Sequence, residues 1–326
     1  MKKNILFVTE VGLPPKGTGH LVRSLNILYE IKNIKKYVLI NNLSKNLHLK
    51  KISTVNILYY HNKKKINFEI FKNKNFIVII DLFSPKLYFL YQIKKYFDKI
   101  ILFDDLHQIK KNIVTTIKPQ ETYRNKIIYK KNNFEYLGSD YFLINNNYVG
   151  LRKKYFIRKN VKNIIVCLGG FVTKKNIQKV SNFLLSIIDN HINITFATGF
   201  SNINTLNINK RISIISKKDL SKILHKYDLC FTAGGFTKFE LFCIGMPLFY
   251  IPTNEHQRKL SIKYAANGYG VYLSKIDNLK KHKNNYKLKI IKIINSYENR
   301  KKMYIRNRSL VDGKGLKRIL NIIKNL

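Results

Sequence analysis

A histidine follows two closely spaced glycines at the point where an apolar helical periodicity begins, in the segment KGTGHLVRSLNI at 16–27. Gly17 and Gly19 permit backbone conformations that a Cβ atom forbids, so the chain can approach a ligand closely. The start of a helix offers unpaired N–H groups and the positive end of its dipole, which suit an anion and favour a neutral His20 that can accept a proton. Arg23, one turn further, can neutralise a phosphate or hold an acidic neighbour. A histidine that merely caps its own loop is an equally good interpretation of the local chemistry.

A second glycine pair ends an apolar segment in LCFTAGGFTKFELFCIG and predicts an anion-binding turn. Gly234 and Gly235 follow a predicted strand, and Thr237 stands near the start of the next helix. Glu240, three residues further, can accept both hydroxyls of a ribose. Thr237 and Glu240 can also form a capping box, which is a common signal of a helix start, so this segment alone does not choose between the two.

Two more segments carry side chains or turns that suit a phosphorylated ligand. The segment CLGG, which ends in Gly169 and Gly170, predicts a similar turn with the same ambiguity. The loop in YIPTNEHQRKL carries His256 and Gln257, which can grip a diphosphate or a sugar. Polar residues in such a loop more often cap the helix that follows them.

Aspartates end two predicted strands of the first half, at Asp81 and at Asp104 with Asp105. In a parallel sheet these carboxylates lie at the same edge as the ligand, where one of them can orient His20 or a substrate hydroxyl. Strand-end aspartates are also routine helix caps. No cluster has the spacing of a catalytic metal site, so we expect none.

Alternating short strands and helices must position these residues, and they restart once along the chain. Strands are predicted at 3–10, 36–40, 55–60, 76–81, 99–105, 162–170, 192–199, 211–216, 228–235 and 246–252. A helix is predicted between the fourth and fifth strands, with Ser84 as N-cap and Pro85 at its first position. The pattern predicts an α/β protein with two Rossmann-like domains that face a cleft.

The basic join GLRKKYFIRKN at 150–160 suggests a linker between these domains. We therefore expect an N-terminal domain at 1–155 that carries the catalytic loop and the sugar side. The C-terminal domain at 156–326 would bind the nucleotide, and its last helices would pack back toward the first domain.

Composition limits the function further. With 326 residues, no long apolar stretch, three scattered cysteines and no secretory signal, the chain is expected to be a soluble cytoplasmic protein. The formal charge of +43 is extreme. It fits a biased genomic base composition, and it also favours phosphorylated ligands and contact with an anionic membrane surface. The lysines are spread over nearly every predicted element, which argues against nucleic acid as a partner.

Taken in order, these segments resemble the UDP-sugar hydrolase of the pseudaminic acid pathway and related proteins of spore-coat and surface-polysaccharide synthesis. The segments are GTGHLVRSLNI, ILFDDL, YLGSDYFLI, CLGG, AGGFTKFEL, the Gln257 loop and LVDGKGLKRIL. The chain is more distantly similar to the glycosyltransferase that adds N-acetylglucosamine in peptidoglycan synthesis, which has the two-domain GT-B fold.

The resemblance implies a UDP-sugar as ligand and no metal or other cofactor. His20 matches the catalytic histidine, which would take a proton from water as that water attacks the anomeric carbon and displaces UDP with inversion. The glycine pairs at 169–170 and 234–235, Glu240 and Gln257 match residues that hold the nucleotide.

Three departures from the family pattern alter contacts to the sugar or phosphate. Phe171-Val172-Thr173 replaces an expected aspartate, Phe83 stands where the hydrolase has a tyrosine, and His256 replaces an asparagine. Hydrolysis remains the main hypothesis, and a GT-B glycosyltransferase that moves the sugar of a UDP-sugar onto a glycan or lipid acceptor is the alternative. In that case His20 would deprotonate an acceptor hydroxyl. A protein that binds nucleic acid through its charge is a third, weaker hypothesis.

Overall fold

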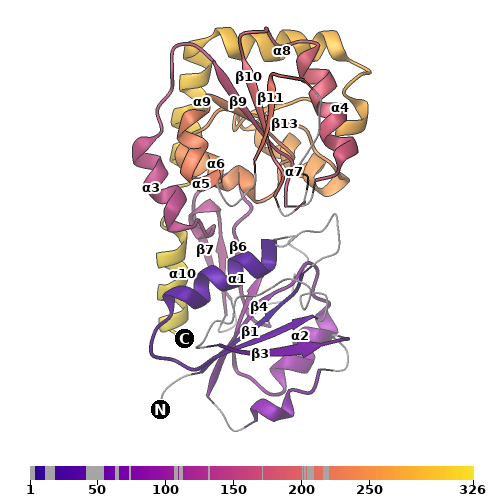
Figure 1. Cartoon of the computed structure of the whole chain (residues 1–326). Coiled ribbons are helices and arrows are strands. Elements are labelled where there is room, and N and C mark those ends of the chain that lie inside the picture. Colours follow the sequence, from indigo (N-terminus) through magenta and orange to yellow (C-terminus); the bar gives the residue numbers. More distant parts are fainter. Residues whose placement is uncertain are drawn as a thin grey trace. The chain divides into compact units, whose positions relative to one another are not determined.

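The chain folds into two compact units in a computed structural model, which describes residues 4–11, 19–41, 55–62, 66–72, 75–105, 109, 113–130, 133–170, 172–199, 201, 203, 209–215 and 220–326 (Figure 1). The first unit comprises Met1–Leu143 and Lys314–Leu326, and the second comprises Ile144–Gly313. The first boundary therefore falls before the expected linker at 150–160. That segment is part of the second unit, where Leu151 and Tyr155 are buried.

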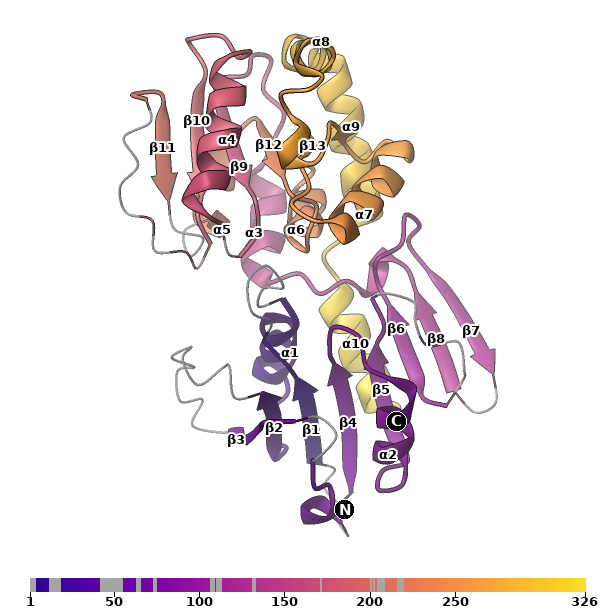
Figure 2. The ribbon, with the colours of Figure 1, turned by 90° about the vertical axis from the view of Figure 1, so that its right-hand side faces the viewer.

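The first unit is built on an eight-stranded sheet in the order β3-β2-β1-β4-β5-β6-β8-β7. Its strands are β1 Asn4–Thr9, β2 Lys36–Asn41, β3 Val55–Tyr60, β4 Phe76–Asp81, β5 Lys99–Phe103, β6 Thr115–Lys118, β7 Lys126–Lys130 and β8 Asn133–Leu137. Neighbouring strands pair in parallel, except that β7 pairs with β8 in antiparallel fashion. Figure 2 shows β7 and β8 at one edge of the sheet.

Helices cover both faces of this sheet. They are α1 Gly19–Glu30, α2 Leu87–Lys94 and α10 Gly315–Lys324. Alternate residues of β1 point to opposite faces, so Ile5 and Phe7 pack with α1 and α10, whereas Leu6 and Val8 pack with α2. The first strand and the last helix of the chain thus pack in the same hydrophobic core.

The predicted start of the helix after β4 is wrong. Helix α2 begins at Leu87, and its N-cap is Lys86 without a side-chain cap, so neither Ser84 nor Pro85 has the expected role. The chain bends at Phe83, whose backbone N–H donates to Glu10 Oε1 at 2.6 Å, before it enters the helix. A tertiary contact overrides the local start signal here.

The second unit has a six-stranded parallel sheet in the order β11-β10-β9-β12-β13-β14. Its strands are β9 Asn163–Cys167, β10 Asn193–Ala197, β11 Ile212–Ile215, β12 Leu229–Thr232, β13 Leu248–Tyr250 and β14 Val271–Tyr272. Its helices are α3 Asn146–Lys154, α4 Lys174–Leu185, α5 Leu220–Ile223, α6 Thr237–Ile244, α7 Glu255–Ala266, α8 Lys283–Asn295 and α9 Tyr297–Leu310.

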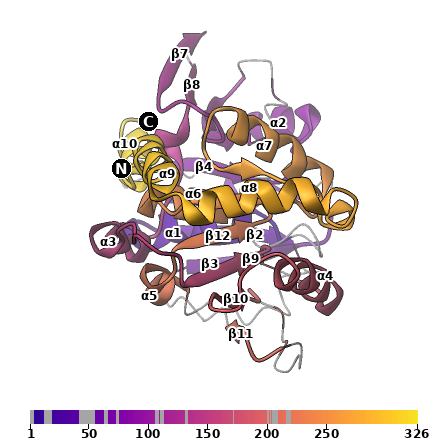
Figure 3. The ribbon, with the colours of Figure 1, turned by 90° about the horizontal axis from the view of Figure 1, so that it is seen from above.

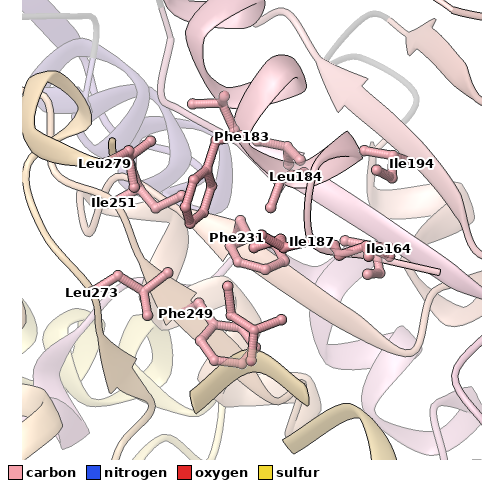
Figure 4. Packing of buried hydrophobic residues seen from close by; sticks show 14 of the residues in the cluster. Ile164, Phe183, Leu184, Ile187, Ile194, Phe231, Phe249, Ile251, Leu273 and Leu279 are labelled. Carbon is pink, nitrogen blue, oxygen red and sulfur yellow. The ribbon is translucent and has the colours of Figure 1, made fainter. Parts of the chain in front are cut away.

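One continuous apolar cluster joins this second sheet to two of its helices. Phe231 of β12 and Phe249 of β13 stack with ring centroids 4.8 Å apart at its centre (Figure 4). Phe183 of α4 meets Tyr286 of α8 edge-to-face, with ring centroids 6.3 Å apart. Figure 3 shows the course of these two helices. This packing holds the carboxyl ends of β9, β10 and β12 together, where the glycine turns lie.

The ten predicted strands are confirmed, as β1 to β5 and β9 to β13. No pattern in the sequence predicted β6, β7, β8 and β14. Among the helices of the described residues, none is both long and apolar enough to cross a membrane.

Candidate active site

The first group of candidate residues surrounds His20, at the start of α1. The β1–β4 pairing places Thr9 opposite Asp81, so Asp81 ends β4 at the edge of the sheet from which α1 begins. His20 Nδ1 lies 2.6 Å from Asp81 Oδ1. The Asp81 side chain is fully buried, and that of His20 is 11% exposed. From the sequence, Asp81 could either orient His20 or cap a helix. In the structure its carboxylate contacts His20.

Arg23 binds the same carboxylate and a second one. Its Nε and Nη2 donate to the two oxygens of Asp81 at 2.7 and 2.5 Å. Its Nη1 and Nη2 donate to the two oxygens of Asp105 at 3.0 and 2.6 Å. The guanidinium carbon also lies 4.3 Å from the ring centroid of Phe103, at the end of β5. One arginine therefore satisfies all four oxygens of two carboxylates, which come from the ends of adjacent strands.

The charges in this network decide which ring nitrogen of His20 carries the proton. Burial alone would raise the pKa of Asp81, but the charge of Arg23 and the hydrogen bonds from Arg23 and His20 outweigh it and hold the pKa below its usual range. Burial opposes the charge of Arg23, yet Asp105 and Asp81 raise its pKa above the ordinary value. An ionised Asp81 only accepts hydrogen bonds, so Nδ1 of His20 must donate to it. Nε2 is then the basic nitrogen of the neutral ring.

The same residues could in principle ligate a metal ion. Ligand atoms of His20, Asp81 and Asp105 lie within 4.8 Å of one another. A cation at this point would have to displace the guanidinium of Arg23, which already binds both carboxylates in a buried setting. The cluster is better suited to hold a protein cation than a metal.

An aromatic side chain, that of Phe83, lies against His20. The ring of Phe83 meets the imidazole nearly edge-on, with centroids 6.3 Å apart and an interplanar angle of 76°. Phe83 is 36% exposed. The position therefore presents an apolar ring, without the hydroxyl that a tyrosine would place beside the imidazole.

The second group of candidate residues belongs to the second unit and consists of turns at the carboxyl ends of β9, β10 and β12. The turn after β12 needs glycine at its first position, because Gly234 has a φ of +81° and a Cβ there would lie 2.3 Å from Ser261 Oγ. The turn after β9 lies against the turn after β10, where a Cβ on Gly199 would lie 2.3 Å from the carbonyl oxygen of Gly170. Gly199 was not among the expected site residues, although it follows β10 as Gly169 and Gly170 follow β9.

The capping-box interpretation of Thr237 and Glu240 is wrong. Thr237 is the first residue of α6, and the N-cap is Phe236, which makes no side-chain cap. The hydroxyl of Tyr148, in α3, lies beside the carboxylate of Glu240. Burial and, after it, the charge of Glu240 raise the pKa of Tyr148 well above its usual value. Tyr148 is thereby a further candidate site residue, and nothing in the sequence around it distinguishes it from a core aromatic.

The loop before α7 does cap its helix, as one interpretation of it expected. The side chain of Asn254 accepts from the backbone N–H of Gln257 at 2.9 Å. Gln257 Oε1 accepts from the backbone N–H and the hydroxyl of Thr253 at 3.0 and 2.8 Å. Its Nε2 lies 3.7 Å from the position that a Cβ would take on Gly235. Gln257 thus links this loop to the glycine turn after β12, and His256 is half-buried beside it in α7.

Two expected residues have no described position. Gly17 and Phe171 lie outside the described residues, whereas Gly19 is the first residue of α1 and is half-buried. Of the first group, the structure brings His20, Arg23, Asp81 and Asp105 together. Of the second, it brings Gln257 to Gly235.

Two parallel α/β units with these sheet orders define the GT-B fold, and the comparisons with solved structures agree. MurG from Acinetobacter baumannii superposes with a TM-score of 0.66 at 10% identity, over 100% of both chains. The spinosyn rhamnosyltransferase SpnG, in complex with thymidine diphosphate, has a TM-score of 0.60 at 11% identity, over 98% of this chain and 100% of its own.

Among proteins of known sequence, the chain is similar to the spore coat polysaccharide biosynthesis protein SpsG of Bacillus subtilis. The two are 26% identical over 271 residues, which are 79% of each chain. The sequence matches no protein-family profile.

Proposed function

We propose that the protein is a nucleotide-sugar enzyme of polysaccharide biosynthesis in which His20 is the general base. The observation that carries this proposal is the contact of His20 Nδ1 with buried Asp81, at 2.6 Å. It leaves Nε2 as the basic nitrogen and fixes the orientation of the ring. The similarity to SpsG supports the polysaccharide context, and the GT-B fold supports a sugar nucleotide as substrate.

Transfer to an acceptor is the reaction that the comparisons favour over hydrolysis. SpnG is named as a rhamnosyltransferase, and other similar structures are glycosyltransferases or epimerases of UDP-N-acetylglucosamine. In the transfer reaction, Nε2 of His20 takes the proton of an acceptor hydroxyl while the oxygen attacks the anomeric carbon. The bond from that carbon to the diphosphate oxygen breaks, and UDP leaves with the electron pair. Asp81 stabilises the imidazolium that forms.

Hydrolysis is the second candidate, and the glycine-rich loop with its histidine favours it through the resemblance described above. Water would then replace the acceptor hydroxyl, and the products would be UDP and a free amino-sugar. His20 and Asp81 would have the same roles in hydrolysis as in transfer. The two reactions differ only in the nucleophile that reaches the anomeric carbon.

The second unit is proposed to hold UDP. The turn of Gly234 and Gly235 and the start of α6 would bind the diphosphate through backbone N–H groups. Glu240, held by Tyr148, would accept the ribose hydroxyls, and Gln257 would support the turn. Gly169 and Gly170 would line the same edge of the sheet.

The positive charge of the chain supports a lipid-linked acceptor. A net charge of +43 would draw the protein to an anionic membrane surface from the cytoplasmic side, where such an acceptor would be met. Transfer to a lipid acceptor in anionic vesicles should then weaken as salt is added, because exposed charges are screened.

The test incubates purified protein with a panel of UDP-sugars, with and without glycan and lipid acceptors, and measures UDP release. Release only in the presence of an acceptor supports transfer, whereas prompt release without one supports hydrolysis. His20→Asn should lower either rate by about 10²-fold or more while UDP still binds. His191→Asn, at an exposed histidine, is the matched control and should keep the rate. An unchanged rate in His20→Asn would refute the proposed mechanism.

A further inference from the structure

A lysine is completely buried behind the glycine turn after β12. Lys238, the second residue of α6, has 0% of its surface exposed. Its Nζ donates to the carbonyl oxygen of Gly234 at 3.1 Å and lies 3.5 Å from that of Gly235. It also lies 4.4 Å from the ring centroid of Phe239 and 4.9 Å from that of Tyr264. All of these groups belong to the second unit.

This is a costly place for a positive charge. An ammonium group loses its hydration when it is buried, and carbonyl oxygens and aromatic faces replace that hydration only in part. The first turn of a helix is also the positive end of its dipole, where a cation is disfavoured. The packing of the core needs no charge at this point, since an unbranched apolar side chain could fill the same space.

The carbonyl oxygens of the turn face the lysine, and that of Gly235 also accepts from the backbone N–H of Lys238 at 3.2 Å. In a planar trans peptide, the N–H of one residue points opposite to the C=O of the residue before it. Because the carbonyls of Gly234 and Gly235 point toward Lys238, the N–H groups of Gly235 and Phe236 point away from it. The N–H groups of these two peptides therefore lie on the side of the turn that faces away from Nζ of Lys238.

We propose that Lys238 is a positioning residue and an internal countercharge for the diphosphate of the bound nucleotide. This inference rests on the proposed function, since it concerns the same nucleotide site. It assigns the ligand of the turn to the class of nucleoside diphosphates, because the attraction grows with the negative charge held against the turn. Affinity should thus rise from uridine to UMP to UDP, and much of that rise should depend on Lys238.

The experiment measures the affinity of uridine, UMP and UDP by calorimetry for the wild-type protein, Lys238→Gln and Lys238→Met. Glutamine keeps a donor for the carbonyls and removes the charge. We expect the ratio of UDP to uridine affinity to fall about tenfold in both variants, which corresponds to about 1.4 kcal/mol. Lys289→Met, at an exposed lysine of α8, changes the net charge equally and should leave the ratio unchanged.

The outcomes separate this inference from the proposed function. If the wild-type protein binds no UDP, the proposed function fails, and this inference fails with it. If the wild-type protein binds UDP and Lys238→Gln keeps the same ratio of affinities, only the role of Lys238 is overturned. An equal loss of uridine and UDP affinity would mean that Lys238 has only a structural role, which also overturns the inference.

A measurement on the wild-type protein covers the case in which the neutral variants fail to fold. With ¹³Cε-labelled lysine, the Lys238 resonance can be assigned by its loss in Lys238→Arg. It should shift when UDP is added and stay in place when uridine is added. A resonance that responds equally to both ligands, or to neither, would overturn the inference.

Discussion

Replacing Asp81 with asparagine separates the catalytic use of the His20 network from its contribution to stability. Asp81 accepts from Nδ1 of His20 and from two nitrogens of Arg23, all within 2.7 Å. An asparagine of nearly the same size removes the charge and offers only one acceptor oxygen. At least one donor of Arg23 or His20 then loses its partner inside the protein.

The size of the effect on stability follows from these contacts. Breaking a buried ion pair by removing one partner costs about 3–5 kcal/mol. Arg23 keeps both of its hydrogen bonds to Asp105, so the loss should lie at the lower end, at about 3 kcal/mol. Asp105→Asn is the matched control, because it takes away the same charge from the same guanidinium and leaves the contact of His20 with Asp81 in place. Both variants should therefore lose a similar free energy of unfolding.

Activity should distinguish the two variants. In Asp81→Asn the amide no longer requires Nδ1 of His20 to carry the proton, so the ring can adopt the wrong tautomer. The rate of UDP release should fall about 10³-fold, within a factor of about ten of the roughly 10⁴-fold loss that follows when the aspartate of a serine-protease triad becomes asparagine. The rate of Asp105→Asn should fall less than about tenfold, since it acts on the ring only through Arg23 and Asp81.

The assays are urea unfolding followed by tyrosine fluorescence and the initial rate of UDP release. Each rate is measured at a temperature at which the variant is fully folded. Rates of Asp81→Asn within threefold of the wild type would refute the role given to the carboxylate. Equal rate losses in the two variants would also refute it, since they would point to a general loss of structure.

Three further predictions follow from other contacts. The folded-state pKa of Asp81 lies below the unfolded value of about 4, so the stability that the ionised carboxylate contributes is present above about pH 4 and is lost as the pH falls through the folded value. The urea midpoint of the wild type should therefore fall more steeply below about pH 4 than that of Asp81→Asn. Parallel curves for the two proteins would contradict this. Deleting 314–326 removes Leu316, Ile319 and two neighbouring isoleucines from the core of the first unit. Each buried side chain contributes about 1.5–3 kcal/mol to the free energy of unfolding, so this unit should lose its cooperative thermal transition in calorimetry. An unchanged transition would refute the packing of α10. Tyr148→Phe removes the hydroxyl that lies beside Glu240 and should weaken UDP binding about fivefold, by about 1 kcal/mol, in calorimetry. Unchanged affinity would separate Glu240 from the ribose site.

Local patterns were sufficient for much of the fold. Short runs of β-branched and aromatic residues predicted β1 to β5 and β9 to β13, because buried parallel strands must be apolar on both faces. The strands β6, β7 and β8 carry lysines, threonines or a glutamate and lie toward one edge of their sheet, so their sequences resemble loops. The N-cap expected at Ser84 failed for a related reason, since the contact of Phe83 with Glu10 joins residues far apart in the chain.

For the candidate site, too, some features could be predicted from the sequence and others depend on the tertiary structure. The sequence by itself determined which residue types stand at the ends of strands and the starts of helices: a histidine after glycines, aspartates at the end of β4 and after β5, and glycine turns after β9 and β12. Only the tertiary structure decided which of them meet. It joined His20 to Asp81 across 61 positions, gave Arg23 two carboxylates, set Tyr148 against Glu240 and buried Lys238 behind a turn. Periodicity and capping are properties of neighbours along the chain, whereas ion pairs and burial depend on the register of strands and the packing of helices, which no local pattern encodes.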